Sequence, residues 1–523
     1  MLYISLAILI LSLISALCLS GRHYIHMFQL NSYKPGVQLE WIRKNSRKHF
    51  IIAAVSAVPS AFGFFGLRDA FSPLPVFLTA AALVIYSAAF FSKGENKVPL
   101  KYTMRVKRLI LSCALLTAAA GAACWLLYSK GLFWNFAGLY LLLFPYMILL
   151  ANLINRPAEL LISRHYIKDA ARLIRECPGL LVIGITGSFG KTSVKYFLEK
   201  LLSVRYNVLK TPGNINTTLG VVRVIREQLK PTHEIFLCEM GARNPGDIRE
   251  ICELVSPRMG VITSVGPMHL ESFGTLERIV ATKFELADSL PQDGGLYLNM
   301  DSEPVAKNAG SRGYISYGID DRSGYYADDI TVGRDGSEFT AHSPSGESER
   351  YKTALIGRHN VLNLMGAIAV ANSLGIPLRE LRAPIRRLES VPHRLQLINK
   401  GDYSIIDDAY NSNPSGARAA LEALSMAEGM KILVTPGMVE LGGSEYELNK
   451  ELGAQAAGVC DFVALVGAKR TAPIRGGLIE SGFPSDRIYV ASTLGEAMEA
   501  VRKVDSGGRR KTILLENDLP DNY

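Results

Sequence analysis

The sequence has few cysteines and no cysteine motif that could bind a metal. Seven cysteines are scattered over 523 residues, and no two of them form a CxxC pair. This spacing gives no support to a zinc ribbon or to a disulfide framework. A reducing cytosolic setting therefore fits the part of the chain that reads as soluble. No low-complexity tract and no fixed-period repeat stands out.

Charged residues are scarce before about residue 155, where long apolar runs dominate. Five runs approach or reach the roughly 20 apolar residues that a membrane-crossing helix needs: Leu2–Ser20, Phe50–Leu67, Leu74–Phe91, Leu109–Tyr128 and Phe133–Ile154. The first run lacks the basic flank of a signal peptide, and four more runs follow it. The second and third are short, so a re-entrant pair is an alternative. We expect a transmembrane α-helical bundle of about five helices over residues 1–155.

Lysine and arginine cluster in alternate loops between these runs. The loops after the first and third runs are strongly basic, whereas the other two loops hold only Arg68 and Lys130. The positive-inside rule then places the N-terminus outside and everything after residue 155 in the cytoplasm. This predicts a multi-pass protein of the cell membrane. Topology and anionic membrane lipid account for the net charge of +9, so no nucleic-acid partner is expected.

Residues 156–178 are expected to link the bundle to the soluble part. Pro157–Glu176 is basic and amphipathic. Such a segment can pack on the next domain or lie on the membrane surface, and both alternatives stay open.

The strongest functional signal is a glycine-rich segment between a predicted strand and a predicted helix. Gly184–Thr192 follows the apolar stretch Leu180–Ile183 and precedes the helical pattern Val194–Leu202. Strand, glycine-rich loop and helix form the architecture of a phosphate-binding loop. Ile185 stands where the strict pattern has its first glycine, so a purely structural turn is the alternative.

Each residue type in this loop has a chemical reason to be there. Backbone N–H groups and the helix N-terminus hold phosphate oxygens. Lys191 would reach the terminal phosphates, and the Thr192 hydroxyl would bind Mg²⁺. The residues expected to bind the nucleotide are therefore Gly187, Ser188, Gly190, Lys191 and Thr192.

The rest of the soluble part alternates strands and helices, which predicts two α/β domains. In the first, residues 179–390, Ile235–Glu239 and Met259–Ser264 read as buried parallel strands, Ser316–Ala354 as a small antiparallel insertion and Leu364–Ser373 as a helix. The second, residues 391–523, reads as a smaller doubly wound, Rossmann-like sheet. Its expected strands are Tyr403–Asp407, Lys431–Thr435, Phe462–Val466, Ile488–Val490 and Thr512–Leu515.

Several polar residues lie where such folds bind ligands. Glu239 ends a buried-type strand and is a candidate Mg²⁺ ligand beside Thr192, with a capping or surface acid as the alternative. Asn360 and Asn363 share a helix face and could read a purine edge, although N-capping by Asn360 can coexist with that role. His269 and Lys283 read, on their own, as a structural histidine and a solvated lysine.

The predicted second domain adds two more candidates. Asp407 and Asp408 end its first strand, where paired acids can hold ribose hydroxyls or a metal. Arg394 lies just upstream, at the inferred domain junction, and could clamp a phosphate. An interdomain salt bridge is the alternative for this arginine.

Taken together, these motifs resemble the Mur ligase family, ATP-dependent amide-bond ligases of cell-wall synthesis. The resemblance covers about residues 180–523, with the motifs in the family's order. They are Thr186–Thr192, Gly213–Asn216, Glu239–Ala242, His269–Glu271, Lys283–Glu285, Gly357–Asn360, Asp407–Asn411 and Val439–Gly442. The similarity is greatest to the member that adds D-Ala-D-Ala to a muramoyl peptide.

The resemblance implies a role for each candidate. Thr192 and Glu239 would hold one Mg²⁺, while His269 and a carbamylated Lys283 would serve a second. Asn360 and Asn363 would lie near adenine, Asp408 near ribose and Arg394 near the γ-phosphate. A substrate carboxylate would take the γ-phosphoryl group of ATP, and an amine would then displace phosphate from the acyl phosphate.

The acceptor is less well defined by the resemblance. A membrane bundle stands where the family has a soluble domain that grips the UDP-sugar. A lipid-linked or polymeric carboxylate acceptor is therefore an alternative to a UDP-linked muramoyl peptide. A membrane scaffold or sensor with an inactive ligase core is the non-enzyme alternative, and the intact Lys191, Thr192, Glu239, His269 and Lys283 argue against it.

Overall fold

The computed structural model describes residues 2–65, 73–90, 98–128, 130, 132–268, 270–310, 313–333, 336–410 and 412–518. These residues fall into two compact units, one up to Arg164 and one from His165 onward. His269, Arg68 and part of the basic loop after the third apolar run lie outside the described residues.

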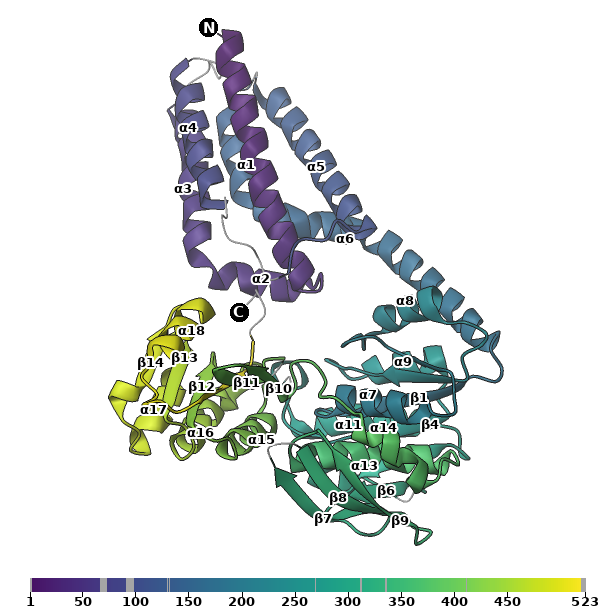
Figure 1. Cartoon of the computed structure of the whole chain (residues 1–523). Helices are drawn as coiled ribbons and strands as arrows, with labels where there is room; N and C mark the ends of the chain where they lie inside the picture. Colours follow the sequence, from purple (N-terminus) through teal and green to yellow (C-terminus); the bar gives the residue numbers. More distant parts are fainter. Residues whose placement is uncertain are drawn as a thin grey trace. The chain divides into compact units, whose positions relative to one another are not determined.

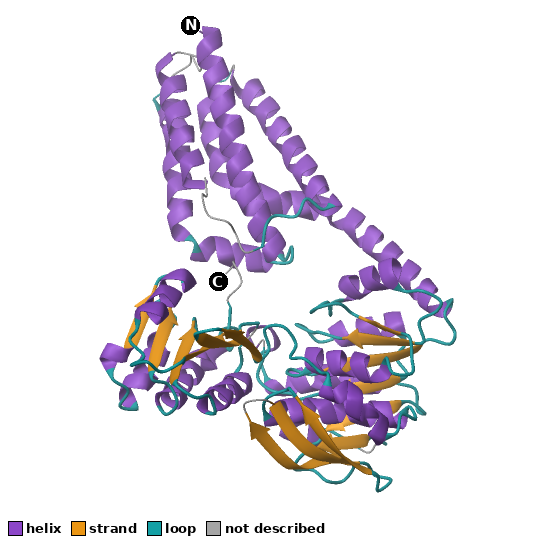
Figure 2. Ribbon diagram, in the orientation of Figure 1, coloured by secondary structure: helices purple, strands orange, loops and turns teal. Residues whose placement is uncertain are grey.

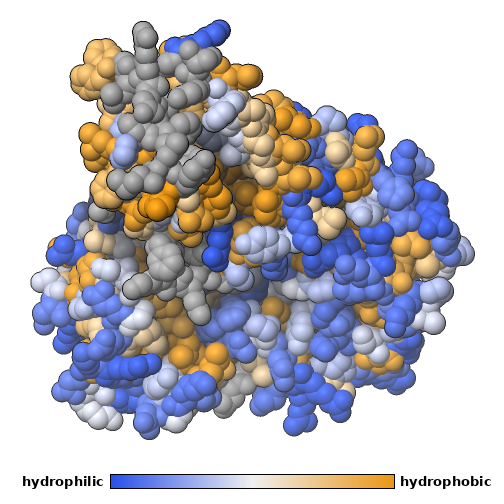
Figure 3. Space-filling view, turned by 90° about the horizontal axis from the view of Figure 1, so that it is seen from above, coloured by the Kyte–Doolittle hydropathy of each residue, from blue (hydrophilic) through white to orange (hydrophobic). Residues whose placement is uncertain are grey.

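The first unit consists of helices (Figure 1). They are α1 (Leu2–Leu30), α2 (Pro35–Lys44), α3 (Ser46–Phe64), α4 (Pro73–Phe90), α5 (Met104–Tyr128) and the first part of α6 (Phe133–Arg175). Among the described residues, α1, α4, α5 and α6 are long and apolar enough to cross a membrane, whereas the apolar part of α3 is the shorter segment His49–Phe62. Figure 3 shows hydrophobic side chains gathered on the surface of this unit, many of them large exposed residues of these helices.

Helix α6 differs from the expected division into a last span and a separate linker. It continues without a break from Phe133 to Arg175, with Pro145 and Pro157 inside it. The predicted boundary at residue 155 therefore falls within one helix. Each proline removes one hydrogen bond of the helix. Close to Pro157 in sequence, an ion pair between Arg108 Nε and Glu159 Oε1 (2.8 Å) connects α6 to α5.

The second unit contains a nine-stranded sheet in the order β2-β3-β1-β4-β5-β6-β7-β8-β9. The strands are β1 (Leu181–Thr186), β2 (Val208–Lys210), β3 (Ile235–Glu239), β4 (Met259–Ile262), β5 (Gly295–Asn299), β6 (Ile315–Gly318), β7 (Tyr325–Gly333), β8 (Gly336–His342) and β9 (Ser348–Thr353). Strands β2 to β6 and β1 are parallel, and β8 pairs antiparallel with both β7 and β9. The predicted antiparallel segment is confirmed, but it continues the parallel sheet through a parallel β6–β7 pair.

Helices cover both faces of this sheet (Figure 2). They are α7 (Lys191–Leu202), α8 (Thr218–Gln228), α9 (Asp247–Val255), α10 (Leu270–Phe273), α11 (Leu276–Ser289), α12 (Glu303–Ala306), α13 (Arg358–Ser373) and α14 (Arg382–Arg386). Side chains alternate along β1: Ile183 and Ile185 pack in the core with α7 and α13, while Val182 packs in the core with α8, α9 and α11. This two-sided burial explains why the strand reads as a continuous apolar run.

A six-stranded sheet follows in the order β10-β11-β15-β12-β13-β14. Its strands are β10 (Gln396–Lys400), β11 (Tyr403–Asp408), β12 (Met430–Thr435), β13 (Phe462–Val466), β14 (Ile488–Ala491) and β15 (Lys511–Glu516). Its helices are α15 (Pro414–Ser425), α16 (Glu445–Ala457), α17 (Ala472–Glu480) and α18 (Leu494–Lys503). The five predicted strands are present, and the edge strand β10, which was not predicted, pairs antiparallel with β11. The carboxyl ends of β11, β15 and β12 therefore meet at one edge.

Candidate active site

The predicted phosphate loop connects β1 to α7. Gly190 is the N-cap of α7 and has φ 83°, a left-handed conformation that favours glycine. A Cβ at Gly190 would collide with Asn363 Oδ1, and a Cβ at Gly187 (φ 144°) would collide with Thr263 Oγ1. Both glycines are therefore required by backbone conformation and by close approach of α13 and the β4 end.

Ser188 is hydrogen-bonded to the segment that follows β4. Its backbone N–H donates to Ser264 O at 2.8 Å, and its hydroxyl donates to Gly266 O at 3.0 Å. These bonds brace the loop against the segment after β4. A phosphate bound by Ser188 would have to replace them.

Lys191, the first residue of α7, lies over the loop. Its Nζ donates to Gly187 O at 2.8 Å and to Ser188 O at 2.9 Å. Burial, helped by the nearby positive charges of Arg394 and Lys195, lowers the pKa of Lys191 to about 8, and Glu239 opposes this shift. An anion at this position would be favoured, because cations from two segments, α7 and the stretch before β10, converge on it.

Glu239 lies at the carboxyl end of β3, next to this loop, and is 1% exposed. Its Oε1 accepts hydrogen bonds from Thr192 Oγ1 at 3.3 Å and from Asn216 Nδ2 at 3.2 Å. Its Oε2 accepts from Lys195 Nζ at 2.7 Å. Burial alone would raise the pKa of Glu239, but the charges of Lys195 and Lys191 outweigh it and hold the pKa below its usual value.

This pair of oxygen donors fits a magnesium ion. A buried, ionised carboxylate and a threonine hydroxyl lie 3.3 Å apart at the start of the phosphate-loop helix. Hard oxygen ligands beside a bound phosphate are what Mg²⁺ prefers. Thr192 and Glu239 are thus brought together as the sequence predicted.

Lys283 is buried in α11, contrary to its reading as a solvated lysine. Burial and the charge of Lys191 lower its pKa to about 7, while Asp247 and Glu285 favour the charged form. Glu285 accepts hydrogen bonds from the backbone of Gly246 (2.7 Å) and Arg249 (3.0 Å), which ties α11 to the first turn of α9. Lys283 therefore lies on a helix that is fixed to α9, and the positive charge of Lys191 is close enough to lower the pKa of Lys283.

Among the described residues, no group of three or more His, Cys, Asp and Glu side chains could hold a metal. His269, the predicted partner of Lys283, lies outside those residues. The predicted second metal site, with His269 and a carbamylated Lys283 as ligands, stays a prediction.

The two predicted adenine-binding asparagines differ in their contacts. Asn363 lies against Gly190, as the collision above shows, so α13 reaches the phosphate loop. Asn360 Nδ2 donates to Ile356 O at 2.9 Å, and the N-cap of α13 is Gly357. The alternative role of Asn360 as the N-cap is therefore excluded, because the helix begins three residues earlier in sequence than that role requires.

Arg394 approaches the same site from the segment before β10. Its guanidinium lies over the ring of Tyr410, 4.6 Å from the ring centroid. Its neighbours His393 (φ 60°) and Leu395 (φ 48°) both have left-handed backbones. Such strain in non-glycine residues tends to occur at functional sites.

Asp408 and Glu516 face each other at the ends of adjacent parallel strands. Burial raises the pKa of Asp408 to about 6, and the neighbouring Asp407 adds to this shift. Burial and the charge of Asp408 raise the pKa of Glu516, which is 1% exposed and accepts a hydrogen bond from Ser412 Oγ. Two carboxyl groups in this position favour sharing a proton.

A pocket of about 370 Å³ opens beside this pair, at the carboxyl ends of β11, β12 and β15. Its lining includes His393, Asp407, Tyr410, Asn517 and Asp518. The edge of an α/β sheet where strands end is the usual position for a ligand.

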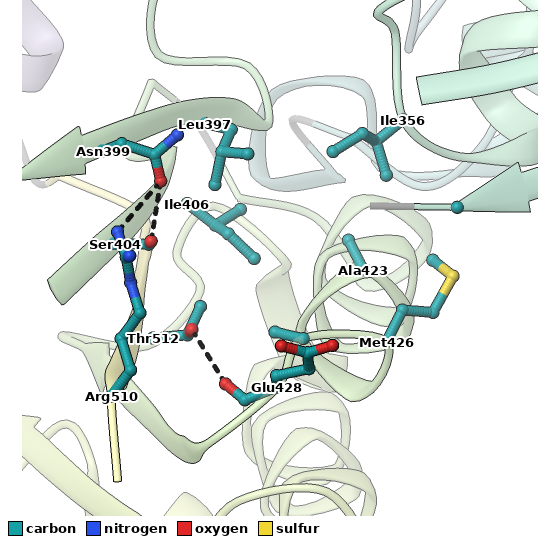
Figure 4. A pocket seen from close by; sticks show the side chains of 12 residues that line it. Ile356, Leu397, Asn399, Ser404, Ile406, Ala423, Met426, Glu428, Arg510 and Thr512 are labelled. Carbon is teal, nitrogen blue, oxygen red and sulfur yellow. Dashed lines mark hydrogen bonds between the residues drawn. The ribbon is translucent and has the colours of Figure 1, made fainter. Parts of the chain in front are cut away.

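A second cavity, of about 80 Å³, lies elsewhere (Figure 4). Its lining includes Ser404, Arg510 and Thr512, at the amino ends of β11 and β15. Because the site residues lie at the carboxyl ends of the same strands, this cavity is not part of the candidate site.

Two family descriptions match the second unit. Residues 185–371 match the Mur ligase middle domain, and residues 393–515 match the Mur ligase glutamate ligase domain. The chain belongs to the Mur ligase family. Its members are ATP-dependent amide-bond ligases, so this chain is an ATP-dependent ligase.

Named relatives of this Mur ligase agree with that assignment. The UDP-N-acetylmuramoyl-tripeptide–D-alanyl-D-alanine ligase of Bacillus subtilis is 33% identical over 334 residues, which are 63% of this chain and 72% of the relative. The enzyme of the same name from Escherichia coli is 32% identical over 331 residues, 61% of this chain and 73% of the relative.

Solved structures of MurF ligases are also similar to this chain. MurF from Acinetobacter baumannii has a TM-score of 0.62 at 27% identity, covering 68% of this chain and 77% of that chain. The MurF ligase of Thermotoga maritima in complex with ADP has a TM-score of 0.59 at 27% identity, covering 67% of this chain and 80% of that chain.

Two site residues of this Mur ligase were not found from its sequence. Lys195 lies one helical turn after Lys191, so its i, i+4 spacing was a usable signal that both face the same way. Glu516 was not recognisable, because its partner Asp408 is more than a hundred residues away and only strand register brings them together.

Proposed function

We propose that this Mur ligase joins D-Ala-D-Ala to the carboxyl group of a UDP-linked muramoyl tripeptide in peptidoglycan precursor synthesis. The observation that carries the proposal is the convergence of Lys191, Thr192, Glu239 and Arg394 around the phosphate loop. Relatives at 32–33% identity are named for this reaction.

The proposed reaction has two steps. An acceptor carboxylate oxygen bonds to the γ-phosphorus of ATP, and the bond to the β-phosphate oxygen breaks, which gives an acyl phosphate and ADP. The amine nitrogen then bonds to the acyl carbon, phosphate leaves, and the amine loses a proton. Lys191 and Arg394 would hold the transferring phosphoryl group, so that positioning and charge provide most of the rate enhancement.

Mg²⁺ bound by Thr192 and Glu239 would neutralise charge on the β- and γ-phosphates. Lys283 is proposed to be carbamylated. A lysine with a pKa near 7 is a neutral amine in about half of the molecules near neutral pH, and only the neutral amine reacts with CO₂. Asn360 and Asn363 are proposed to lie near adenine, and Asp408 near ribose.

The helical unit is proposed to span the cell membrane, with the N-terminus outside and the ligase domains in the cytoplasm, where ATP is available. The apolar helices α1, α4, α5 and α6 and the basic alternate loops support this topology. The same helices favour a second candidate acceptor, a lipid-linked muramoyl peptide presented at the membrane surface.

Phosphate release by the purified full-length protein in detergent tests the proposal. We expect release with ATP only when a muramoyl tripeptide and D-Ala-D-Ala are both present. Lys191→Ala should reduce turnover by about 10²–10³-fold with the fold unchanged, because it removes a charge at the phosphoryl group. Lys200→Ala, an exposed position on the same helix, serves as the control.

Three outcomes would contradict parts of the proposal. Normal turnover by Lys191→Ala would refute the site. Turnover with a lipid-linked but not a UDP-linked tripeptide would show that the acceptor is the lipid-linked muramoyl peptide. No turnover with any pair of substrates would support an inactive core.

A further inference from the structure

Lys195 is a buried charged residue beside the phosphate loop, and the mechanism above gives it no role. Lys195, in α7, is 2% exposed in its side chain, and its Nζ donates to Glu239 Oε2 at 2.7 Å and to Gly213 O at 2.7 Å. Burying an ammonium group costs free energy unless strong partners compensate for the lost water. Glu239 and the Gly213 carbonyl are such partners, and they fix the ammonium on one side of the carboxylate.

The two oxygens of Glu239 are consequently different. Oε2 is covered by Lys195 through a short, charge-assisted hydrogen bond. Oε1 has only longer bonds, 3.3 Å from Thr192 Oγ1 and 3.2 Å from Asn216 Nδ2. A cation arriving from the phosphate loop therefore meets Oε1, on the side of the Thr192 hydroxyl, and cannot reach Oε2 without displacing Lys195.

We propose that Lys195 is a specificity-determining residue that makes Glu239 a one-oxygen ligand and so selects Mg²⁺ over Ca²⁺. Mg²⁺ requires near-octahedral geometry at about 2.0–2.1 Å, which single carboxylate oxygens satisfy. Ca²⁺ accepts six to eight ligands at about 2.3–2.6 Å and readily takes both oxygens of a carboxylate. With Oε2 covered, Ca²⁺ loses a ligand that Mg²⁺ does not use.

Contacts of the surrounding loop keep the ammonium in this position. Gly213, whose carbonyl binds Lys195, opens the segment that ends at Asn216, and Asn216 O accepts a hydrogen bond from Gly241 N at 2.8 Å. A Cβ at Gly241 would collide with the Asn216 side chain. The segment is thus fixed to the end of β3, and Lys195 has a fixed acceptor on each side.

The inference rests on the proposed magnesium site, and a binding experiment separates the two. Calorimetry on the full-length protein in detergent would measure the affinity for a non-hydrolysable ATP analogue with Mg²⁺ or with Ca²⁺. Four proteins are compared: wild type, Lys195→Met, Lys195→Arg and Lys200→Met, an exposed position on the same helix. Lys195→Met keeps an unbranched side chain that is one atom shorter and removes the charge, whereas Lys195→Arg keeps a cationic donor.

We expect wild type, Lys195→Arg and Lys200→Met to favour the Mg²⁺ complex by about tenfold, which is about 1.4 kcal/mol. Lys195→Met should lose most of this preference, chiefly because Ca²⁺ binds more tightly. An unchanged Mg²⁺/Ca²⁺ ratio in Lys195→Met would overturn the inference. A wild type that binds the analogue equally well without any divalent ion would instead refute the magnesium site itself.

A second measurement applies even if Lys195→Met does not fold. Infrared difference spectra of wild type on adding Ca²⁺ or Mg²⁺ report carboxylate ligation, because the two carboxylate stretching bands lie far apart for one-oxygen binding and close together for two-oxygen binding. We expect the wide separation with both ions and its loss in Glu239→Gln. A narrow separation in the wild type with Ca²⁺ would contradict the inference.

Discussion

At the level of single residues, the pKa of Lys283 determines the pH at which this lysine can form a carbamate. Its pKa of about 7 means that raising the pH through neutrality converts the side chain to the neutral amine, whose nitrogen attacks the carbon of CO₂ and then loses a proton to give the carbamate. We expect a carbamate carbon signal in NMR spectra of protein equilibrated with ¹³C-bicarbonate, growing between about pH 6 and pH 8. Lys283→Ala should lack the signal and regain some activity with added short carboxylates. A signal that is identical in Lys283→Ala would rule out this assignment.

The Asp408–Glu516 pair predicts how stability depends on pH. The pKa of Asp408 is raised to about 6 in the folded state, so folding favours the protonated carboxyl group. The stability that this group contributes is fully present at a pH below its unfolded-state pKa, and it is lost as the pH rises through about 6. Glu516→Gln removes one of two facing acids and leaves an amide donor. We expect this variant to be more stable by about 1 kcal/mol at pH 8 and little changed in acid.

Thermal unfolding between about pH 4 and pH 8 checks this prediction. Glu422→Gln, which changes an exposed acid on α15, is the matched control. A gain of stability that is the same at every pH, or shared by Glu422→Gln, would show that the carboxyl pair is not its cause.

At the scale of elements, the junction of the phosphate loop with α7 depends on Gly190. Gly190→Ala would add the strain of a left-handed alanine, about 1–2 kcal/mol, and a collision with Asn363 of α13. Gly375 has nearly the same φ, 84°, but open space around its Cβ position. Gly375→Ala therefore carries the strain alone.

We expect Gly190→Ala to destabilise the protein more than Gly375→Ala and also to weaken nucleotide binding. Chemical denaturation and calorimetry with ADP measure the two effects. Equal losses in both variants would mean that the close approach of α13 to the loop has no consequence for binding.

The elements also show what could be predicted from the sequence. The loop after β1 was predictable, because an apolar strand, a glycine-rich turn and an amphipathic helix are local patterns. Strand β10 was missed since its half-buried, antiparallel edge position gives no continuous apolar run. The burial of Lys283 and the pairing of Lys195 with Glu239 could not be predicted from local patterns, because they depend on how α11, α7 and β3 pack.

At the scale of the whole molecule, the proposed topology has a direct test. A fluorescent protein fused to the C-terminus should fluoresce in cells, and a periplasm-dependent phosphatase fused at the same place should be inactive. An N-terminal tag should be accessible from outside. An active C-terminal phosphatase would contradict the topology, because it would separate the phosphate loop from cytoplasmic ATP.

In the proposed reaction the acceptor carboxylate itself takes the γ-phosphoryl group of ATP. An isotope experiment tests this transfer: the muramoyl tripeptide is labelled with ¹⁸O in its terminal carboxyl group, and the phosphate released in the presence of ATP and D-Ala-D-Ala is analysed by mass spectrometry. We expect one ¹⁸O atom in each phosphate, because the carboxyl oxygen that bonds to phosphorus leaves with it when the amine attacks. Phosphate without ¹⁸O would mean that water takes the phosphoryl group, and it would contradict the ligase mechanism.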